Sequence, residues 1–237
     1  MTQILKRLRW VLVLFLALLL LGVAAWQVSN ARCFALLGES VCRIETSAKV
    51  VALTLDDGPT ELGLAAALPV LEANGSRATF FLIGQEVERR PHLIRRIVAG
   101  GHEIGNHSFS HRWMIGRPDT FHDAEIGRTH KALIEAGAPP PRLFRPPYGK
   151  KLWGLPAALR RRGYRLIMID VEEPGIDDPK AYADRLVRDV RPGSIILMHL
   201  MYRPNRVARD ALPLVLRGLR ARGFQVVTVG ELERRAA

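Results

Sequence analysis

The sequence VVALTLDDGP (50–59) joins an apolar run to two acids and a turn, and it indicates how this chain folds. Val50–Leu55 is rich in β-branched and other apolar residues, which predicts a buried strand. Gly58-Pro59 ends that strand, so the backbone can turn and present both preceding acids at one edge. The segment therefore predicts a strand that delivers Asp56 and Asp57 to a common site.

Six more β-rich runs follow, and helical stretches alternate with them. The expected strands after the first are Thr79–Ile83, Glu103–Asn106, Leu143–Arg145, Arg165–Ile169, Ser194–Met198 and Gln225–Val229. The expected helices are Glu86–Ala99, Phe121–Ala136, Lys151–Arg162, Lys180–Val190 and Arg206–Arg222. This alternation predicts an α/β fold with a parallel sheet, and about seven units favour barrel-like closure.

Polar residues stand where several of these strands end. In β/α barrels, reactive groups collect at the carboxyl ends of the strands. Beyond Asp56 and Asp57, the strand-end residues are His107, Arg145, Asp170 and His199. We therefore expect these side chains to converge at one mouth of the barrel.

HSFSH (107–111) carries two imidazoles that can reach one metal ion if the intervening backbone turns. Two imidazoles and one carboxylate, with a position left for water, are typical of catalytic zinc and related divalent sites. The neighbouring Asn106 and Ser108 are candidates to support the ligands. A pair of ordinary loop histidines is the alternative.

Two further motifs, RPPYG (145–149) and IILMH (195–199), contain candidate catalytic residues. The prolines stiffen the first loop, and an arginine there can keep a catalytic carboxylate ionised. The apolar run before His199 delivers one imidazole to a strand end, which suits a general acid. A surface salt bridge for Arg145 and a core histidine for His199 are the alternatives.

The N-terminus predicts a membrane segment. A basic flank (residues 1–9) precedes an uncharged stretch, Trp10–Trp26, that would form a helix of about 25 Å. The flank should stay in the cytoplasm, leaving the catalytic domain extracytoplasmic, periplasmic or at the cell surface. The alternative is a signal peptide cleaved after Ser29-Asn30-Ala31, which would give a secreted protein.

Residues 27–47 read as a connector and residues 48–237 as the catalytic domain. Cys33 and Cys42 are the only cysteines, and in an oxidising compartment they could close a small disulfide loop; two unpaired thiols are the alternative. The net charge of +12 fits an anionic membrane or an acidic polymer. Nucleic acid is not an expected partner, because the basic residues are scattered and form no binding motif. The oligomeric state stays open.

The chain resembles the polysaccharide deacetylase family, also called the NodB-homology domain or carbohydrate esterase family 4. The resemblance covers about residues 49–233. TLDDGP, HSFSH, RPPYG and IILMH look like the first, second, third and fifth motifs of that family, in the same order. It implies a distorted (β/α)7 barrel, in agreement with the seven units above.

The resemblance also implies roles for individual residues. The implied catalytic groups are Asp56 as base, His199 as general acid and Arg145 as the group that orients the base. The implied metal ligands are Asp57, His107 and His111, with zinc preferred and cobalt, nickel or iron as alternatives. The implied pocket residues are Tyr148, whose backbone N–H helps hold the oxyanion, and Leu197 beside the acetyl methyl.

The fourth motif departs from the family pattern. Relatives often carry an Asp-Trp pair there, with the acid supporting the arginine. This chain has Glu173 followed by Pro174, so Glu173 is one candidate support for Arg145 and Asp170 is the other. One wall of the substrate site is therefore expected to differ from that of better-known relatives.

These features predict a metal-dependent hydrolase that removes N-acetyl groups from an amino-sugar polysaccharide or oligosaccharide of the cell envelope. One alternative is a deacylase or deformylase of a lipid-linked amino sugar, which a membrane anchor would favour. The other is a glycan-binding module that has lost catalysis. That alternative expects a missing base, ligand or acid, and none is missing from the sequence.

Overall fold

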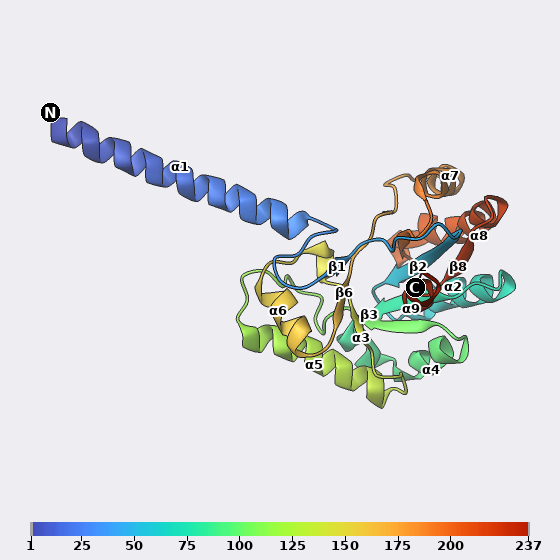
Figure 1. The fold of residues 1–237 in the computed structure, drawn as a ribbon. Helices are drawn as coiled ribbons and strands as arrows, with labels where there is room; N and C mark the ends of the chain where they lie inside the picture. Colours follow the sequence, from blue (N-terminus) through green and yellow to red (C-terminus); the bar gives the residue numbers. More distant parts are fainter. Residues whose placement is uncertain (1, 237) are drawn as a thin grey trace.

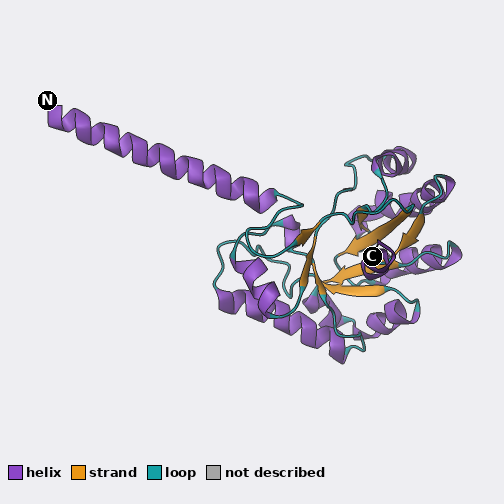
Figure 2. Cartoon of the chain, viewed as in Figure 1, coloured by secondary structure: helices purple, strands orange, loops and turns teal. Residues whose placement is uncertain are grey.

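The computed structural model describes residues 2–236 and shows a curled parallel sheet surrounded by helices (Figure 2). The strands are β1 (Ser40–Val41), β2 (Val50–Asp56), β3 (Ala78–Leu82), β4 (Glu103–Asn106), β5 (Leu143–Phe144), β6 (Arg165–Ile167), β7 (Ile195–His199) and β8 (Gln225–Val227). They pair in the order β1-β6-β5-β4-β3-β2-β7, and β8 also pairs with β2. All of these strand pairs are parallel, as the alternating sequence pattern predicted.

Strand β2 is the centre of the sheet. Residues 52–56 pair with β7 on one side of it, and the amino-terminal residues Val50–Ala52 pair with β8 on the other side. All seven residues of β2 are buried. A strand covered on both faces needs a continuous apolar run, which is why VVALTL precedes the acids without alternation.

The sheet curls far enough for its two ends to meet. A parallel bridge joins Val171 to Ile196, and an antiparallel bridge joins Arg43 to Ser194. The expected distorted (β/α)7 barrel is confirmed. The two-residue strand β1 is an addition that the sequence pattern did not predict, since it lies in the connector.

Nine α-helices occur among residues 2–236. They are α1 (Thr2–Asn30), α2 (Glu61–Ala73), α3 (Gly84–Arg89), α4 (Pro91–Ala99), α5 (Asp119–Glu135), α6 (Gly154–Arg161), α7 (Pro179–Asp189), α8 (Arg206–Ala221) and α9 (Val229–Ala236). Short 3₁₀ turns span Pro147–Gly149 and Arg203–Asn205.

The helix predicted over Glu86–Ala99 is wrong as a single element, because it breaks between α3 and α4. Pro91 begins α4 and has no N–H to continue the preceding helix. Two further helices, α2 and α9, had no predicted counterpart. The last strand is also shorter than expected, because α9 begins at Val229.

The core lies between the sheet and the helices. Leu53, Phe80 and Leu212, from β2, β3 and α8, have no solvent exposure and belong to one cluster. Full burial of each such side chain contributes about 1.5–3 kcal/mol relative to exposure. This packing fixes the strands and therefore the positions of the residues at their carboxyl ends.

Helix α1 projects from the body as a straight rod (Figure 1). Its segment Gln3–Asn30 has a mean hydropathy of 2.6 over its most apolar window, and none of that window is buried. It is therefore long and apolar enough to cross a membrane, although a signal sequence would meet the same criteria. The helix continues to Asn30, so the first part of the predicted connector is helical.

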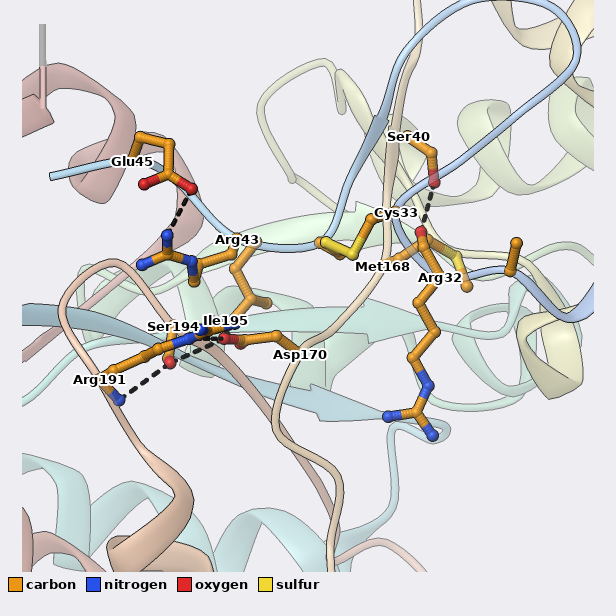
Figure 3. Close-up of a disulfide and its surroundings, with 12 residues drawn as sticks. Arg32, Cys33, Ser40, Arg43, Glu45, Met168, Asp170, Arg191, Ser194 and Ile195 are labelled. Atoms are coloured by element: carbon orange, nitrogen blue, oxygen red, sulfur yellow. Dashed lines mark hydrogen bonds and ion pairs between the residues drawn. A yellow bond between two sulfur atoms is a disulfide. The ribbon is translucent and has the colours of Figure 1, made fainter.

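A disulfide joins Cys33 to Cys42 at the start of the catalytic body (Figure 3). The bridged segment contains β1, which pairs with β6. Ser40 donates a hydrogen bond to the Arg32 carbonyl across the same loop, at 2.7 Å. The connector is therefore held against the sheet.

Candidate active site and metal centre

A cavity of about 500 Å³ opens at the carboxyl ends of the strands. Eight residues singled out from the sequence line it, namely Asp56, Asp57, His107, His111, Arg145, Tyr148, Leu197 and His199. They come from β2, β7 and the loops after β4 and β5. The expected convergence of strand-end residues therefore holds for these groups.

Strand register places Asp56 and His199, the residues predicted as base and general acid, side by side. Asp56 and His199 are paired residues in the parallel β2–β7 ladder, and each ends its strand. Asp56 is only 3% exposed, so its carboxylate needs a charged or hydrogen-bonding partner. Arg145 supplies one, with Nη1 2.6 Å from Asp56 Oδ1.

The Arg145 guanidinium is held on several sides. It donates to Thr54 Oγ1 at 2.6 Å, to the Met168 carbonyl at 3.0 Å and to the Ile167 carbonyl at 3.3 Å. The side chain also lies over the Phe81 ring, 4.2 Å from its centre. Burial lowers the pKa of Arg145, and the Asp56 carboxylate opposes that shift. This framework orients Asp56 within the cavity.

Asp57 faces the two histidines of HSFSH. Its Oδ1 lies 3.3 Å from His111 Nε2 and 3.7 Å from His107 Nε2. This oxygen is buried and forms no hydrogen bond with the described residues, an arrangement that costs free energy unless a cation is bound. One ligand atom from each of the three side chains lies within 4.8 Å of the others. The donor set therefore fits a divalent metal ion.

The hydrogen bonding of His107 suits a ligand. Its Nδ1 lies 2.7 Å from the Arg145 carbonyl oxygen, which can only accept, so Nδ1 carries the proton. The lone pair of Nε2 is then free to bind a metal. Burial and the neighbouring His107 lower the pKa of His111, although both aspartates oppose the shift. The net effect favours the neutral, metal-binding form of His111.

The HSFSH loop is shaped by contacts that its sequence does not reveal. Ser108 and His111 have positive φ angles of 64° and 55°, which are costly for residues other than glycine. The buried Glu125 of α5 accepts hydrogen bonds from the backbone of Phe109 and Ser110, each at 2.8 Å, and from the Ser110 hydroxyl at 2.7 Å. Asn106 and Ser108 support this loop through its backbone and not through an imidazole nitrogen, since Asn106 accepts from the Ser108 N–H at 3.0 Å and Ser108 accepts from the His111 N–H at 3.1 Å.

His199 has a different kind of partner. Its Nδ1 lies 2.6 Å from Glu173 Oε1, and its backbone N–H donates to Glu173 Oε2 at 3.2 Å. Tyr182 donates to the same carboxylate at 2.8 Å. Burial disfavours the charged imidazolium, but the Glu173 hydrogen bond and the Asp56 charge outweigh it and raise the pKa of His199 to about 9. His199 is therefore protonated at neutral pH.

The expected support of Arg145 by Glu173 or Asp170 is wrong. Among residues 2–236, neither carboxylate forms a hydrogen bond or ion pair with the guanidinium. Glu173 binds His199 instead. Asp170 accepts from the Ser194 hydroxyl at 2.9 Å and from the Ile195 N–H at 2.8 Å (Figure 3), and it is not among the residues that line the cavity.

The cavity also has walls that the sequence did not indicate. Asn30 and Arg32 of the connector and Glu172 line it, although they lie outside the motifs. Arg32 pairs with Glu172 across the mouth. The sequence did not indicate Glu125 either. Nothing in the sequence of α5 distinguishes a buried glutamate that binds the HSFSH loop from a glutamate on a solvent-exposed helix face. The Cys33–Cys42 spacing was the one signal that the connector is fixed near the cavity.

Together these residues place the buried Asp56 carboxylate, the protonated His199 and a three-residue donor set that fits a divalent cation around one cavity. This combination is suited to hydrolysis, in which water attacks a carbonyl and the departing group takes a proton.

Comparisons with known proteins show what this chain is similar to. A model of the polysaccharide deacetylase family matches residues 43–167. A peptidoglycan-N-acetylglucosamine deacetylase of Bacillus cereus is 30% identical over 220 residues, which cover 90% of this chain and 94% of the relative. A chitooligosaccharide deacetylase of Sinorhizobium fredii is 36% identical over 78% of this chain and 92% of its own length.

Solved structures show the same fold. That of the Bc1960 peptidoglycan N-acetylglucosamine deacetylase superposes with a TM-score of 0.77 at 27% identity, covering 82% of this chain and 92% of the other. A carbohydrate esterase family 4 pseudoenzyme from Bacillus anthracis gives 0.74 at 26% identity, covering 81% and 68%. Because a pseudoenzyme shares the fold, the catalytic residues must be judged one by one.

Proposed function

Because this chain belongs to the polysaccharide deacetylase family, we propose that it is a metal-dependent N-deacetylase of acetylated amino sugars in the cell envelope. The observation that carries the proposal is the completeness of the site. The base Asp56, the acid His199 and the ligand set Asp57, His107 and His111 all line one cavity. Relatives named as deacetylases of peptidoglycan and of chitooligosaccharides support this substrate class.

Asp57, His107 and His111 would hold the cation, with zinc preferred and cobalt, nickel or iron as alternatives. When bound, a divalent cation polarises the acetamide carbonyl and makes water a better nucleophile at neutral pH. The orphaned Asp57 oxygen and the free Nε2 atoms support this assignment.

Asp56 accepts a proton from the water that attacks the acetamide carbon, and Arg145 keeps it ionised beforehand. The backbone N–H of Tyr148 stabilises the oxyanion, and Leu197 contacts the acetyl methyl. His199 gives its proton to the sugar nitrogen as the carbon–nitrogen bond breaks. Acetate leaves, and the free amine remains on the sugar.

Glu173 positions His199 rather than Arg145. Its carboxylate holds the imidazole through Nδ1 and stabilises the charged form, so Nε2 is left as the proton donor. Pro174 follows it in place of the family's tryptophan. Arg32 and Glu172 supply part of the cavity wall instead.

We place the membrane anchor at residues 10–26, the connector at 27–47 and the catalytic domain at 48–237. The basic flank would lie in the cytoplasm and the cavity outside it. The apolar, unburied surface of α1 and the disulfide in the connector support this topology.

The test is acetate release by the full chain in nanodiscs, with and without added zinc. The substrates are chitooligosaccharides, peptidoglycan and lipid-linked acetylated sugars. We expect acetate from at least one, loss of activity after chelation and recovery with metal. A metal-loaded protein that binds a glycan but releases no acetate from any of them would identify it as a non-catalytic binding module.

A further inference from the structure

Exposed apolar side chains outside α1 gather near the end of that helix. Among the described residues, nine large hydrophobic side chains outside α1 are exposed. Six of them lie on the connector and on two loops beside the cavity, namely Phe34, Leu36, Leu37, Trp113, Tyr148 and Trp153. We call these six residues the docking face. Such clustering on a surface marks an interaction site.

Contacts join the docking face to the end of α1. Lys150 Nζ lies 4.4 Å from the centre of the Trp26 ring and 6.0 Å from that of Trp113. The Trp113 and Tyr148 rings are 5.9 Å apart. The connector runs beside α6, where Leu37 and Pro156 line one small hollow. The part of the face formed by Trp113 and Tyr148 is therefore continuous with the last turns of the apolar helix.

The end of α1 is built into the catalytic domain. Ser29 is only 2% exposed, and its carbonyl accepts a hydrogen bond from the Lys151 N–H at 3.4 Å. The Lys151 side chain is 1% exposed and donates to the Ala31 carbonyl. These contacts fix the direction in which α1 leaves the domain, and Figure 1 shows α6 on the side from which it leaves.

The chemistry of the face matches a lipid surface. Tryptophan and tyrosine have an apolar ring and a polar atom, and they concentrate at the boundary between headgroups and acyl chains. Arg112, Arg117 and Lys150 stand among them, and basic side chains are attracted to anionic headgroups. The tryptophans follow this pattern throughout, since Trp10 and Trp26 bracket the apolar segment of α1.

We propose that the docking face rests on the outer surface of the lipid bilayer that α1 crosses. The proposal depends on the membrane anchoring proposed above. It adds that the catalytic domain is seated on the membrane rather than tethered at a distance from it.

This arrangement determines where the cavity opens. Tyr148 belongs both to the docking face and to the cavity lining. Asn30 also lines the cavity and lies four residues beyond Trp26, which is about 6 Å along a helix. The cavity is therefore held close to headgroup level, where it can reach sugars carried on or lying against the membrane.

The test uses the full chain in nanodiscs and a set of variants with one tryptophan each, the others being changed to phenylalanine. The reporters are Trp26, Trp113 and Trp153. The matched control is Ile134→Trp, because Ile134 is 42% exposed but lies at the opposite end of α5. The probe is phosphatidylcholine with phosphatidylglycerol, brominated near the headgroup end of the acyl chains, compared with the same lipids without bromine.

Bromine should reduce the fluorescence of Trp26, Trp113 and Trp153 about twofold, as expected for rings at the membrane interface, and should leave the control unchanged. Quenching of Trp26 without quenching of Trp113 and Trp153 would overturn the docking proposal and leave the anchor intact. An unquenched Trp26 would refute both. Neither readout requires activity, so a failure here is distinct from a failure of the proposed deacetylation.

Discussion

The cavity has a metal side, formed by Asp57, His107 and His111, and an acid side, formed by His199 and Glu173. The buried polar groups of the two sides find their partners in different ways. On the metal side, Asp57 Oδ1 has no hydrogen-bond partner among the described residues and faces two imidazole nitrogens. On the acid side, His199 and Glu173 already satisfy each other at 2.6 Å. The metal side is therefore complete only with a cation bound, whereas the acid side is complete within the protein itself.

Mutations on the two sides should therefore have different measurable effects. Changes on the metal side should alter metal affinity, because we propose that these side chains and their supports hold the cation. Changes on the acid side should leave the metal in place and alter the dependence of activity on pH, because they act on a protonation equilibrium.

The largest effect is expected from removing a ligand. His107→Ala should lower kcat/KM by about a thousandfold or more, since a bound metal supplies several kcal/mol of transition-state stabilisation. Metal content measured by elemental analysis should fall in parallel. His92→Ala is the control, because His92 is exposed and pairs with Glu61 away from the cavity. Full metal retention in the His107 variant would remove it from the ligand set.

A smaller effect on the same side is expected from Glu125→Gln. The neutral amide cannot accept all three hydrogen bonds as strongly, so the HSFSH loop should lose its ordered shape. Metal affinity should fall about 10- to 100-fold, as for other groups that orient ligands. Zinc titration measures it, and Glu135→Gln at the exposed end of the same helix should bind zinc normally. Equal affinities for the two variants would contradict the role given to Glu125.

The acid side is tested by Glu173→Gln. Glu173 helps to raise the pKa of His199 to about 9, so its loss should lower that pKa. The acid must be protonated to act, and the alkaline limb of the pH–activity profile should therefore move to lower pH. At a fixed alkaline pH, a shift of one pKa unit lowers activity by about tenfold.

Glu173→Asp supplies the control for this variant, because it keeps the charge and should restore most of the alkaline limb. Metal content should be unchanged in both. A profile that does not move in Glu173→Gln, or a loss of metal, would remove the proposed distinction between the two sides.

The reacting groups and the residues that support them differ in how far the sequence predicts them. The ligands and the base occupy short contiguous motifs at strand ends, so strand register alone brings Asp56 next to His199. The supports come from elsewhere in the chain. Glu125 reaches the HSFSH loop from α5. Its role depends on packing between elements, and no local pattern encodes that.

The same limit explains the error over Arg145. The sequence suggests Asp170 or Glu173, after the fifth predicted strand, as the partner and gives no reason to prefer main-chain carbonyls. The fold places the Ile167 and Met168 carbonyls within reach of the guanidinium and directs Glu173 to His199. The barrel itself could be predicted because strand and helix periods alternate along the chain. The break at Pro91 was missed because helical periodicity continues across it.

The most direct measurement compares metal content and acetate release in the wild-type full chain and in Asp56→Asn. The asparagine is nearly isosteric with the aspartate but cannot accept the proton of the attacking water. Because Asp57, and not Asp56, is assigned to the metal, the variant should bind zinc as the wild type does and release no measurable acetate. Loss of zinc from the variant, or turnover close to that of the wild type, would contradict the assignment of Asp56 as the base.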